Sequence, residues 1–481
     1  MKKITLLIIT LFLTAQTIKA QTVELDANGV TIKWTGTTVP SPYFVQASPR
    51  GTLEWFAIVD NSTTSDITNY AKNIQSGISY FTPTGQSTSI PFNNIVTTLV
   101  TDMSNIFINA IAFNQTIGSW DLSNVTNMSF MFGGATSFDQ NISSWNVSNV
   151  TTMDGMCYGA TAFNQPIGSW NVSNVINMGF MFQSATAFNQ PIGSWNVSNV
   201  IDMRYMFFGA TSFNQPIGSW NLGNVINIAV MFYGATAFNQ PIGSWNVSNV
   251  IEMNFMFYGA TAFNQPIGSW NVSNVIDMRY LFFGAISFNQ PIGSWNVSNV
   301  IEMNFMFQSA NAFNQNISSW DVSNVTNMEG MFSNAGLSTA NYDALLIGWS
   351  TISANETPLK PNVTFSGGNS KYCNGATARA SIISTYGWTI TDAGLDCTSL
   401  DTETFDTVAL KLYPNPVVSI LNVKVDDNLI NQPYYVFDSL GRVVLNGNLV
   451  DIDTTINVEQ LSKGIYYLKV SDNIASKFIK E

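Results

Sequence analysis

The sequence contains no histidine, and this absence removes whole classes of chemistry. Histidine is the commonest general base and a leading metal ligand, so Ser-His and Cys-His nucleophiles and His-zinc sites are excluded. No other group of residues resembles an enzyme's active site. We therefore expect a protein that is not an enzyme and that has no resident cofactor.

Charge is also scarce, and what there is has mostly one sign. Only 10% of the 481 residues are charged, against 46% hydrophobic, and the net charge is -12. An acidic chain without basic patches is repelled by phosphate backbones and by anionic membrane surfaces. Nucleic acid is therefore not an expected partner.

Long hydrophobic runs are missing as well. No segment approaches the ~20 apolar residues that a membrane-spanning helix needs. The apolar run at residues 4–13 follows Lys2 and Lys3 and precedes a candidate cleavage site at residues 18–20 that ends in the small Ala20, an order typical of an export signal. We expect residues 1–20 to be a signal peptide and no transmembrane segment to remain after its removal. The residue directly after the cleavage site is Gln21 and not cysteine, so a lipid anchor there is not expected.

An internal repeat dominates the rest of the chain. Tryptophan recurs every 25 residues from Trp120 to Trp320, and phenylalanine does so from Phe113 to Phe313. A fixed period of 20–29 residues is typical of leucine-rich-repeat-like solenoids. One unit cannot bury its own apolar face, whereas stacked units can. We therefore predict a solenoid of stacked repeats over residues 101–334.

Each repeat is predicted to combine a short strand with a helical turn. Trp195 and Val197 alternate with polar residues, which favours a strand with one face inward. The helical turn is predicted from the spacing of Val200, Met203, Met206 and Phe207. Asn199 and its equivalents are candidates for an internal ladder that bonds one coil to the next.

Such a stack needs a cap at each end, and the cysteines fall accordingly. We assign residues 21–100 to an N-terminal cap and residues 335–398 to a C-terminal cap. Cys373 and Cys397 lie in the second cap, and in an oxidising compartment we expect them to form a disulfide. Cys157 occupies a column otherwise filled by phenylalanine, so it is predicted to be a buried, unreactive thiol.

These repeats resemble the BspA-like leucine-rich-repeat surface proteins. The matching segments are residues 142–153 and 317–328, and in the cap residues 341–349 and 386–392. The resemblance covers about residues 100–396. It implies a bacterial surface protein, and some members of that family are adhesins. Members that are lipoproteins begin with an acylated cysteine, which this chain lacks.

The last residues have a different pattern. After an acidic, Thr-rich linker at 399–407, alternating runs predict an antiparallel β-sandwich over residues 408–481, with strands at 410–413, 421–425, 434–437, 443–445 and 465–470. The fold class is thus α+β, a leucine-rich-repeat-like solenoid of short strands and helical turns followed by a small sandwich. Residues 413–416, 440–442 and 461–466 resemble the type A sorting domain of the type IX secretion system. The resemblance implies a Bacteroidetes-type cell, the type IX machinery as partner, and a location outside the cell or on the outer-membrane surface.

Two columns of aromatic residues could form a binding surface. One consists of Tyr158, Phe208, Tyr233, Tyr258 and Phe283, and the other of Phe130, Phe180, Tyr205, Phe255, Tyr280 and Phe305. Exposed columns would suit stacking on sugars or contact with a protein partner. The alternative is that they pack between coils as part of the core.

An acidic column could bind an ion. Glu252, Asp277 and Glu302 occupy the same place on consecutive coils, with Arg204 and Arg279 nearby. Carboxylates roughly 5–6 Å apart could hold a calcium ion or, in principle, form a retaining glycosidase pair. The alternative is a solvated acidic stripe that the arginines partly balance.

Taken together, the sequence predicts a secreted or cell-surface binding protein that is not catalytic, such as an adhesin for an extracellular protein or glycan ligand. Two alternatives belong to other classes. A glycan-binding or glycan-processing accessory protein would need exposed aromatic residues beside close carboxylates. A structural surface-coat or gliding-associated protein would bind no soluble ligand.

Overall fold

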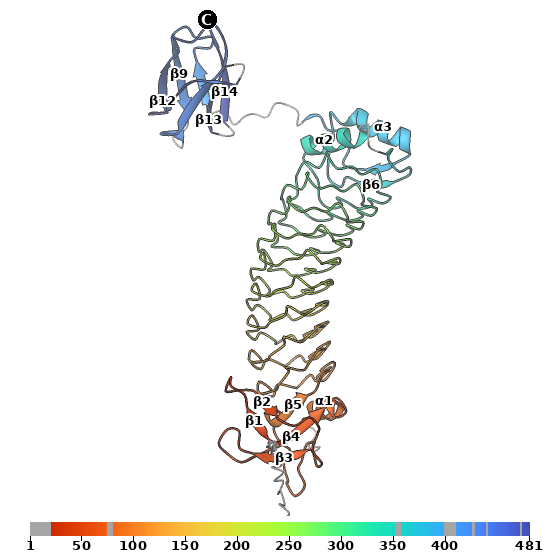
Figure 1. Cartoon of the computed structure of the whole chain (residues 1–481). Helices are drawn as coiled ribbons and strands as arrows, with labels where there is room; N and C mark the ends of the chain where they lie inside the picture. Colours follow the sequence, from red (N-terminus) through yellow and green to blue (C-terminus); the bar gives the residue numbers. More distant parts are fainter. Residues whose placement is uncertain are drawn as a thin grey trace, which may run out of the picture. The chain divides into compact units, whose positions relative to one another are not determined.

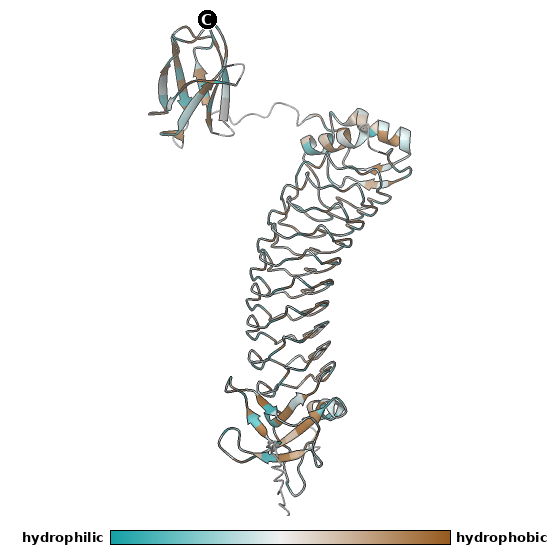
Figure 2. Cartoon of the chain, viewed as in Figure 1, coloured by the Kyte–Doolittle hydropathy of each residue, from teal (hydrophilic) through white to brown (hydrophobic). Residues whose placement is uncertain are grey.

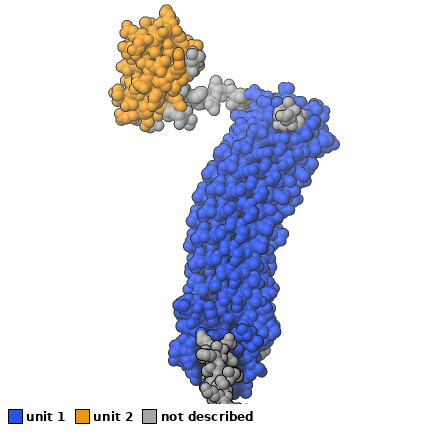
Figure 3. All heavy atoms as spheres, in the orientation of Figure 1, with its two compact units in different colours: residues 1–395 blue, residues 396–481 orange. Residues whose placement is uncertain are grey.

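The computed structural model describes residues 21–74, 80–351, 357–398, 410–425, 429–438, 441–471 and 474–481. The chain divides into two compact units, residues 1–395 and 396–481 (Figure 3). Secondary structure is mostly strand with few helices, and the strands form several small sheets. The predicted mixed class is therefore confirmed in this coarse form. The predicted signal peptide (1–20) and linker (399–407) lie outside the described residues.

The first unit begins with a small cap of strands beneath the repeats (Figure 1). A two-stranded antiparallel sheet lies beside a sheet of order β3-β4-β5, in which β4 and β5 run parallel. The centre of β4 is apolar and buried, and the strands of the cap include hydrophobic stretches, brown in Figure 2. The backbone of Ile32 donates to Ser119 O at 2.8 Å, which joins the cap to the first coil. The elements are β1 (Val23–Leu25), β2 (Ile32–Trp34), β3 (Phe44–Ala47), β4 (Glu54–Asp60), α1 (Thr64–Lys72), η1 (Phe92–Asn94) and β5 (Ile95–Leu99).

Residues 101–334, the repeat stack, form coils that bond to one another without a helix or an extended strand. Backbone N–H groups at alternate positions donate to the next coil, as Tyr205 does to Ala229 O at 3.1 Å and Phe207 to Met231 O at 2.9 Å. The groups between them donate three residues back within the same coil, as Phe208 does to Tyr205 O at 3.1 Å. Together, the bonds to the next coil and the bonds within the coil pair the backbone N–H groups of residues 205–210 and of their equivalents.

The predicted position of the strand is therefore wrong. The N–H of Trp195 donates to Ile192 O within its own coil at 3.1 Å, and the coil-to-coil contact lies later, around Asp202. The inward side chains of Trp195 and Val197 come from turns that imitate the alternation of a strand. The predicted helical turn is likewise a series of hydrogen-bonded turns rather than a helix.

The core of the stack is continuous from coil to coil. Each coil contributes the same inward set, and in one coil every member is at most 3% exposed: Phe188, Ile192, Trp195, Val197, Val200, Met203, Met206, Phe207 and Ala210. Cys157 is free and fully buried, as predicted, and burial raises the pKa of its thiol. Asn199 forms the expected coil-to-coil bond, donating from Nδ2 to Ser173 O at 2.7 Å, but it lies on the surface rather than inside.

The spacing between coils differs from one side of the stack to the other. The rings of Tyr233 and Tyr258, which are equivalent residues, lie 4.3 Å apart. The spacing is 5.8 Å for Phe232 and Phe257 in the core. It is 6.4 Å for Trp270 and Trp295. Equivalent rings of consecutive coils lie closest together on the tyrosine side, so the stack bends with that side on the inside of the curve.

A second cap closes the other end of the stack. The buried carboxylate of Asp343 accepts N–H groups of Cys373, Asn374 and Gly375 at 2.8–2.9 Å, which fixes the start of α3 against α2. Cys373 and Cys397 are both disulfide-bonded. The elements are α2 (Thr339–Ser350), β6 (Thr364–Ser366), α3 (Ala376–Tyr386) and β7 (Thr389–Thr391), and β6 pairs with β7 in parallel.

The second unit contains two antiparallel sheets around an apolar core. Their strand orders are β12-β9-β8 and β11-β10-β13-β14. Val423, Val436 and Leu468 are among the fully buried residues between them. The strands are β8 (Leu410–Tyr413), β9 (Ile420–Val425), β10 (Pro433–Phe437), β11 (Val443–Asn448), β12 (Asp453–Asn457), β13 (Gly464–Ser471) and β14 (Ile474–Lys480).

Candidate functional site

Two positions, three residues apart, carry aromatic residues in most coils, on the inside of the curve. The first aromatic column is Tyr158, Phe208, Tyr233, Tyr258 and Phe283. The second is Phe130, Phe180, Tyr205, Phe255, Tyr280 and Phe305. Tyr158 is 40% exposed, and the other members of both columns are half-buried. The sequence left open whether the columns are exposed or part of the core, and in the structure their exposure is intermediate.

Where aromatic residues follow one another in consecutive coils of a column, their rings stack face to face. Tyr258 lies between Tyr233 and Phe283 at 4.3 Å on both sides, with interplanar angles of 3° and 2°. In the second column Tyr280 lies between Phe255 at 4.5 Å and Phe305 at 4.8 Å. The columns also touch each other, with the rings of Tyr258 and Tyr280 at 6.3 Å. From Phe180 to Phe305 the two columns form one aromatic surface. Phe130 and Tyr158 form a separate pair, with their rings 6.1 Å apart.

This stacking leaves ring edges rather than ring faces for a partner. A sugar stacks on the face of an aromatic ring, and both faces of Tyr258 and of Tyr280 are already covered. Even the end of the second column is closed, because a Cβ at Gly330 would overlap the ring of Phe305. The sugar-stacking interpretation therefore does not fit these rings. Their edges and the tyrosine hydroxyl groups suit contacts with a polypeptide instead.

The second column adopts a backbone conformation that aromatic residues usually avoid. Tyr205, Phe255 and Tyr280 all have φ of +57°. Four residues further along, each coil has a second left-handed residue, but there glycine, serine or asparagine is used, as at Gly209, Ser184 and Asn334. A left-handed residue with a Cβ costs roughly 1–2 kcal/mol. Glycine is used at this position in two coils, at Gly155 and Gly330, yet six coils keep an aromatic residue there, which indicates that the aromatic side chains serve a purpose.

The acidic column is only partly organised. Asp277 accepts both Nε and Nη2 of Arg279, at 3.1 and 2.7 Å, and Glu252 accepts Nδ2 of Asn227 at 2.9 Å. Glu302 is half-buried and accepts a long bond from Thr326. In the part of the chain that the structure describes, no three acidic side chains form a group that could hold a metal ion. Glu252, Asp277 and Glu302 thus do not form the predicted calcium site, because their carboxylates bond to amides, hydroxyls and arginine instead.

A comparison with protein families identifies the repeats. The family described as "Mycoplasma protein of unknown function, DUF285" matches residues 78–189, 165–267 and 240–345, which together cover more than half of the chain. The chain belongs to this family. The BspA-like family is not the one named by this match. No curated protein matches the chain.

The end of this DUF285-family protein matches a second family. Residues 411–481 match the secretion system C-terminal sorting domain. The sorting domain is of the type IX kind, which supports a secreted or surface protein and implies engagement with the type IX secretion machinery. In the part of the chain that the structure describes, no helix is both long and apolar enough to cross a membrane.

One acidic residue in the repeat stack of this DUF285-family protein has an unpaired oxygen. Asp154 is half-buried, and its Oδ1 has no hydrogen-bond partner. Burial, and then the charge of Asp202, raise the pKa of Asp154, while Arg204 and Asn177 lower it less. A carboxyl group with a raised pKa in the folded state favours folding below its ordinary pKa and loses that contribution as pH rises.

We therefore expect Asp154→Asn to stabilise the protein at pH 7, by less than about 1 kcal/mol because the side chain is partly solvated. The gain should disappear near pH 3, where aspartate is protonated in both states. Asn254 and Asn304 occupy the same column in later coils, so asparagine fits there. Urea unfolding at both pH values measures the effect, and Glu329→Gln, at an exposed position in this column, is the control. A loss of stability at pH 7 would contradict the prediction.

Sequence reasoning missed a groove on another side of the coils. Isoleucines stand beside the asparagine ladder and are 42–47% exposed: Ile176, Ile201, Ile226, Ile251, Ile276 and Ile301. A groove of about 650 Å³ runs over three of them, from Asn149 to Ile226. Ile201 directly follows the buried Val200 in the sequence. The signal that could have found it is that two adjacent residues of an extended segment cannot both point inward.

Proposed function

We propose that this protein is a non-catalytic adhesin, exported by the type IX system and retained at the cell surface or released. In this proposal the repeat stack is a leucine-rich-repeat-like solenoid of the BspA-like kind. The inside of its curve binds an extracellular protein. One observation carries the proposal: the half-buried aromatic residues of the second column occupy left-handed positions where glycine would be less strained.

Several features support a protein ligand over a glycan. The faces of Tyr258 and Tyr280 are covered by neighbouring rings, so their exposed parts are edges and hydroxyl groups. Aromatic residues, above all tyrosine and tryptophan, are enriched at the centres of protein interfaces. A repeat stack offers such a surface over many coils, which suits an extended partner. Contacts repeated from coil to coil also provide avidity.

The test is binding of the full chain to an array of extracellular-matrix proteins and glycans. The variant Tyr233→Ala/Tyr258→Ala removes two adjacent rings of the first aromatic column. We expect it to weaken binding to a matrix or cell-surface protein at least tenfold, because interface tyrosines are common hot spots.

The matched control is Ile226→Thr/Ile251→Thr in the groove. Thr126, Thr151 and Thr326 occupy this same column in other coils, so the substitution is compatible with the fold. The control should bind as the unmodified chain does. If the tyrosine variant retains full binding, or if only a glycan binds and the variant loses it, the protein-ligand proposal is wrong. Absence of any binding by folded protein would favour a structural coat role.

A further inference from the structure

One buried tryptophan lacks the hydrogen bond that its counterparts make. In the stack each indole donates to an isoleucine carbonyl of the previous coil, as Trp320 does to Ile292 O at 3.0 Å. Trp120, the first indole of the stack, donates instead to Phe92 O in the N-terminal cap, and Trp388 in the C-terminal cap donates to Lys360 O. Trp349 is only 3% exposed, and its Nε1 has no partner. A buried, unpaired donor is costly and requires an explanation, such as a water molecule or a ligand.

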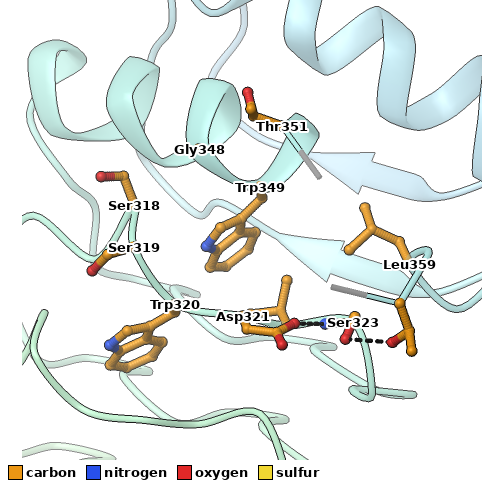
Figure 4. Close-up of a pocket in the computed structure, with 11 residues that line it drawn as sticks. Ser318, Ser319, Trp320, Asp321, Ser323, Gly348, Trp349, Thr351 and Leu359 are labelled. Carbon is orange, nitrogen blue, oxygen red and sulfur yellow. Dashed lines mark hydrogen bonds between the residues drawn. The ribbon is translucent and has the colours of Figure 1, made fainter. Parts of the chain in front are cut away.

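The indole of Trp349 lines a cavity at the end of the stack. The cavity has a volume of about 420 Å³ and lies between the last coil, at residues 318–323, and the end of α2. Figure 4 shows the ring of Trp349 below this helix, with its nitrogen on the side of Ser318 and Ser319. The close approach of the helix requires Gly348, because a Cβ there would overlap the carbonyl oxygen of Ser318. The volume falls within the range of small-molecule sites.

The lining restricts the chemistry of an occupant. Asp321 contributes a carboxylate, of which Oδ1 accepts the N–H of Ser323 at 2.9 Å. Among the described residues that line the cavity there is no lysine or arginine, so an anion would meet an unbalanced negative charge. A simple ammonium group would pair with Asp321 but would offer no acceptor to the indole. Val322, Leu359 and Trp320 supply apolar surface beside these polar groups.

From this combination we infer that the cavity binds a neutral polyhydroxyl molecule of monosaccharide size. A sugar hydroxyl group both accepts and donates hydrogen bonds. One hydroxyl can accept from Nε1 of Trp349, and another can donate to the carboxylate of Asp321. The carbon skeleton then contacts the apolar surface. This site uses none of the aromatic-column residues, so it goes beyond the proposed function and stands or fails separately from it.

The full chain, labelled with nitrogen-15, allows a direct test. Glucose, galactose, mannose and fucose are titrated to tens of millimolar while the indole N–H resonances are followed, and Trp349→Phe assigns the resonance of Trp349. We expect at least one sugar to shift this resonance saturably. Trp349→Phe, which keeps an aromatic ring but removes the donor, should weaken binding of that sugar about tenfold. Asp321→Asn should also weaken it.

Trp388→Phe is the matched control, because it removes an indole that already has a partner, at 2.8 Å from Lys360 O. It should lower the melting temperature and leave sugar binding unchanged. Trp349→Phe should lower the melting temperature less than Trp388→Phe does, since both variants lose ring volume in the core but only Trp388→Phe loses a hydrogen bond. The inference is overturned if no sugar shifts the resonance of Trp349, in which case a buried water satisfies the indole. It is equally overturned if Trp349→Phe binds the sugar as tightly as the unmodified chain.

Discussion

Replacing Phe257 with alanine is expected to destabilise the repeat stack by about 3–5 kcal/mol, as for other buried phenylalanines. Phe257 is fully buried, and its ring lies 4.0 Å from Phe263 and 5.6–5.8 Å from its equivalents in the neighbouring coils. The substitution leaves a cavity on both sides of one coil. Because each coil is stabilised by its contacts with the two neighbouring coils, the interfaces on both sides of the substituted coil are weakened. The midpoint of urea unfolding, followed by tryptophan fluorescence, measures the loss.

The next residue provides the matched comparison. Tyr258 is half-buried and stacks only within the first aromatic column. Each of its two stacked pairs contributes about 0.5–1.5 kcal/mol, so Tyr258→Ala should cost about 1–3 kcal/mol, less than Phe257→Ala. Equal losses at the two positions would place the aromatic column in the core and remove the support for a binding surface.

The contrast between these neighbours also marks how far the sequence can be interpreted. Period and residue type suffice to place Phe257 inside, because a large apolar side chain repeated at every coil has to be buried somewhere. They do not determine the backbone hydrogen bonds. Trp195 and Val197 satisfy the alternation of a strand, yet Trp195 bonds within its own coil. Turns can produce the same alternation, so the position of the coil-to-coil contact could not be deduced from the pattern.

The candidate site shows the same division. The aromatic columns could be found from the sequence because they repeat. Their stacking could not, since it depends on how closely the rings of consecutive coils approach, which is 4.3 Å between the ring centres of Tyr233 and Tyr258. The left-handed backbone at Tyr205 and Tyr280 had only an indirect signal in the sequence, which is that glycine takes the same position at Gly155 and Gly330. In the sorting domain, β12 was missed because Asp453 and two threonines hide its alternation, whereas the apolar strands β9 and β13 were found.

Gly368 is the glycine at which an added methyl group should have the largest effect. It follows β6 in the C-terminal cap and has φ of +61°. A Cβ there would overlap the carbonyl oxygen of Phe332 and lie 2.6 Å from that of Ala335, both in the last coil. Neither oxygen can move freely, because Asn369 donates to Ala335 O at 2.8 Å and Phe332 itself donates to Ser366 O at 3.0 Å. The cap would have to shift away from the stack.

We therefore expect Gly368→Ala to cost about 2–4 kcal/mol, the sum of the left-handed conformation and the overpacking. Gly234→Ala separates the two contributions. Gly234 has nearly the same φ, +64°, but the nearest atom to its added Cβ is Gly209 Cα at 3.9 Å. It should cost only the conformational part, roughly 1 kcal/mol. Hydrogen exchange at residues 328–335 should rise in Gly368→Ala and stay unchanged in Gly234→Ala. Similar melting temperatures for the two variants would mean that the cap yields without loosening the last coil. In that case the tight contact at Gly368 would not be what attaches the cap to the stack.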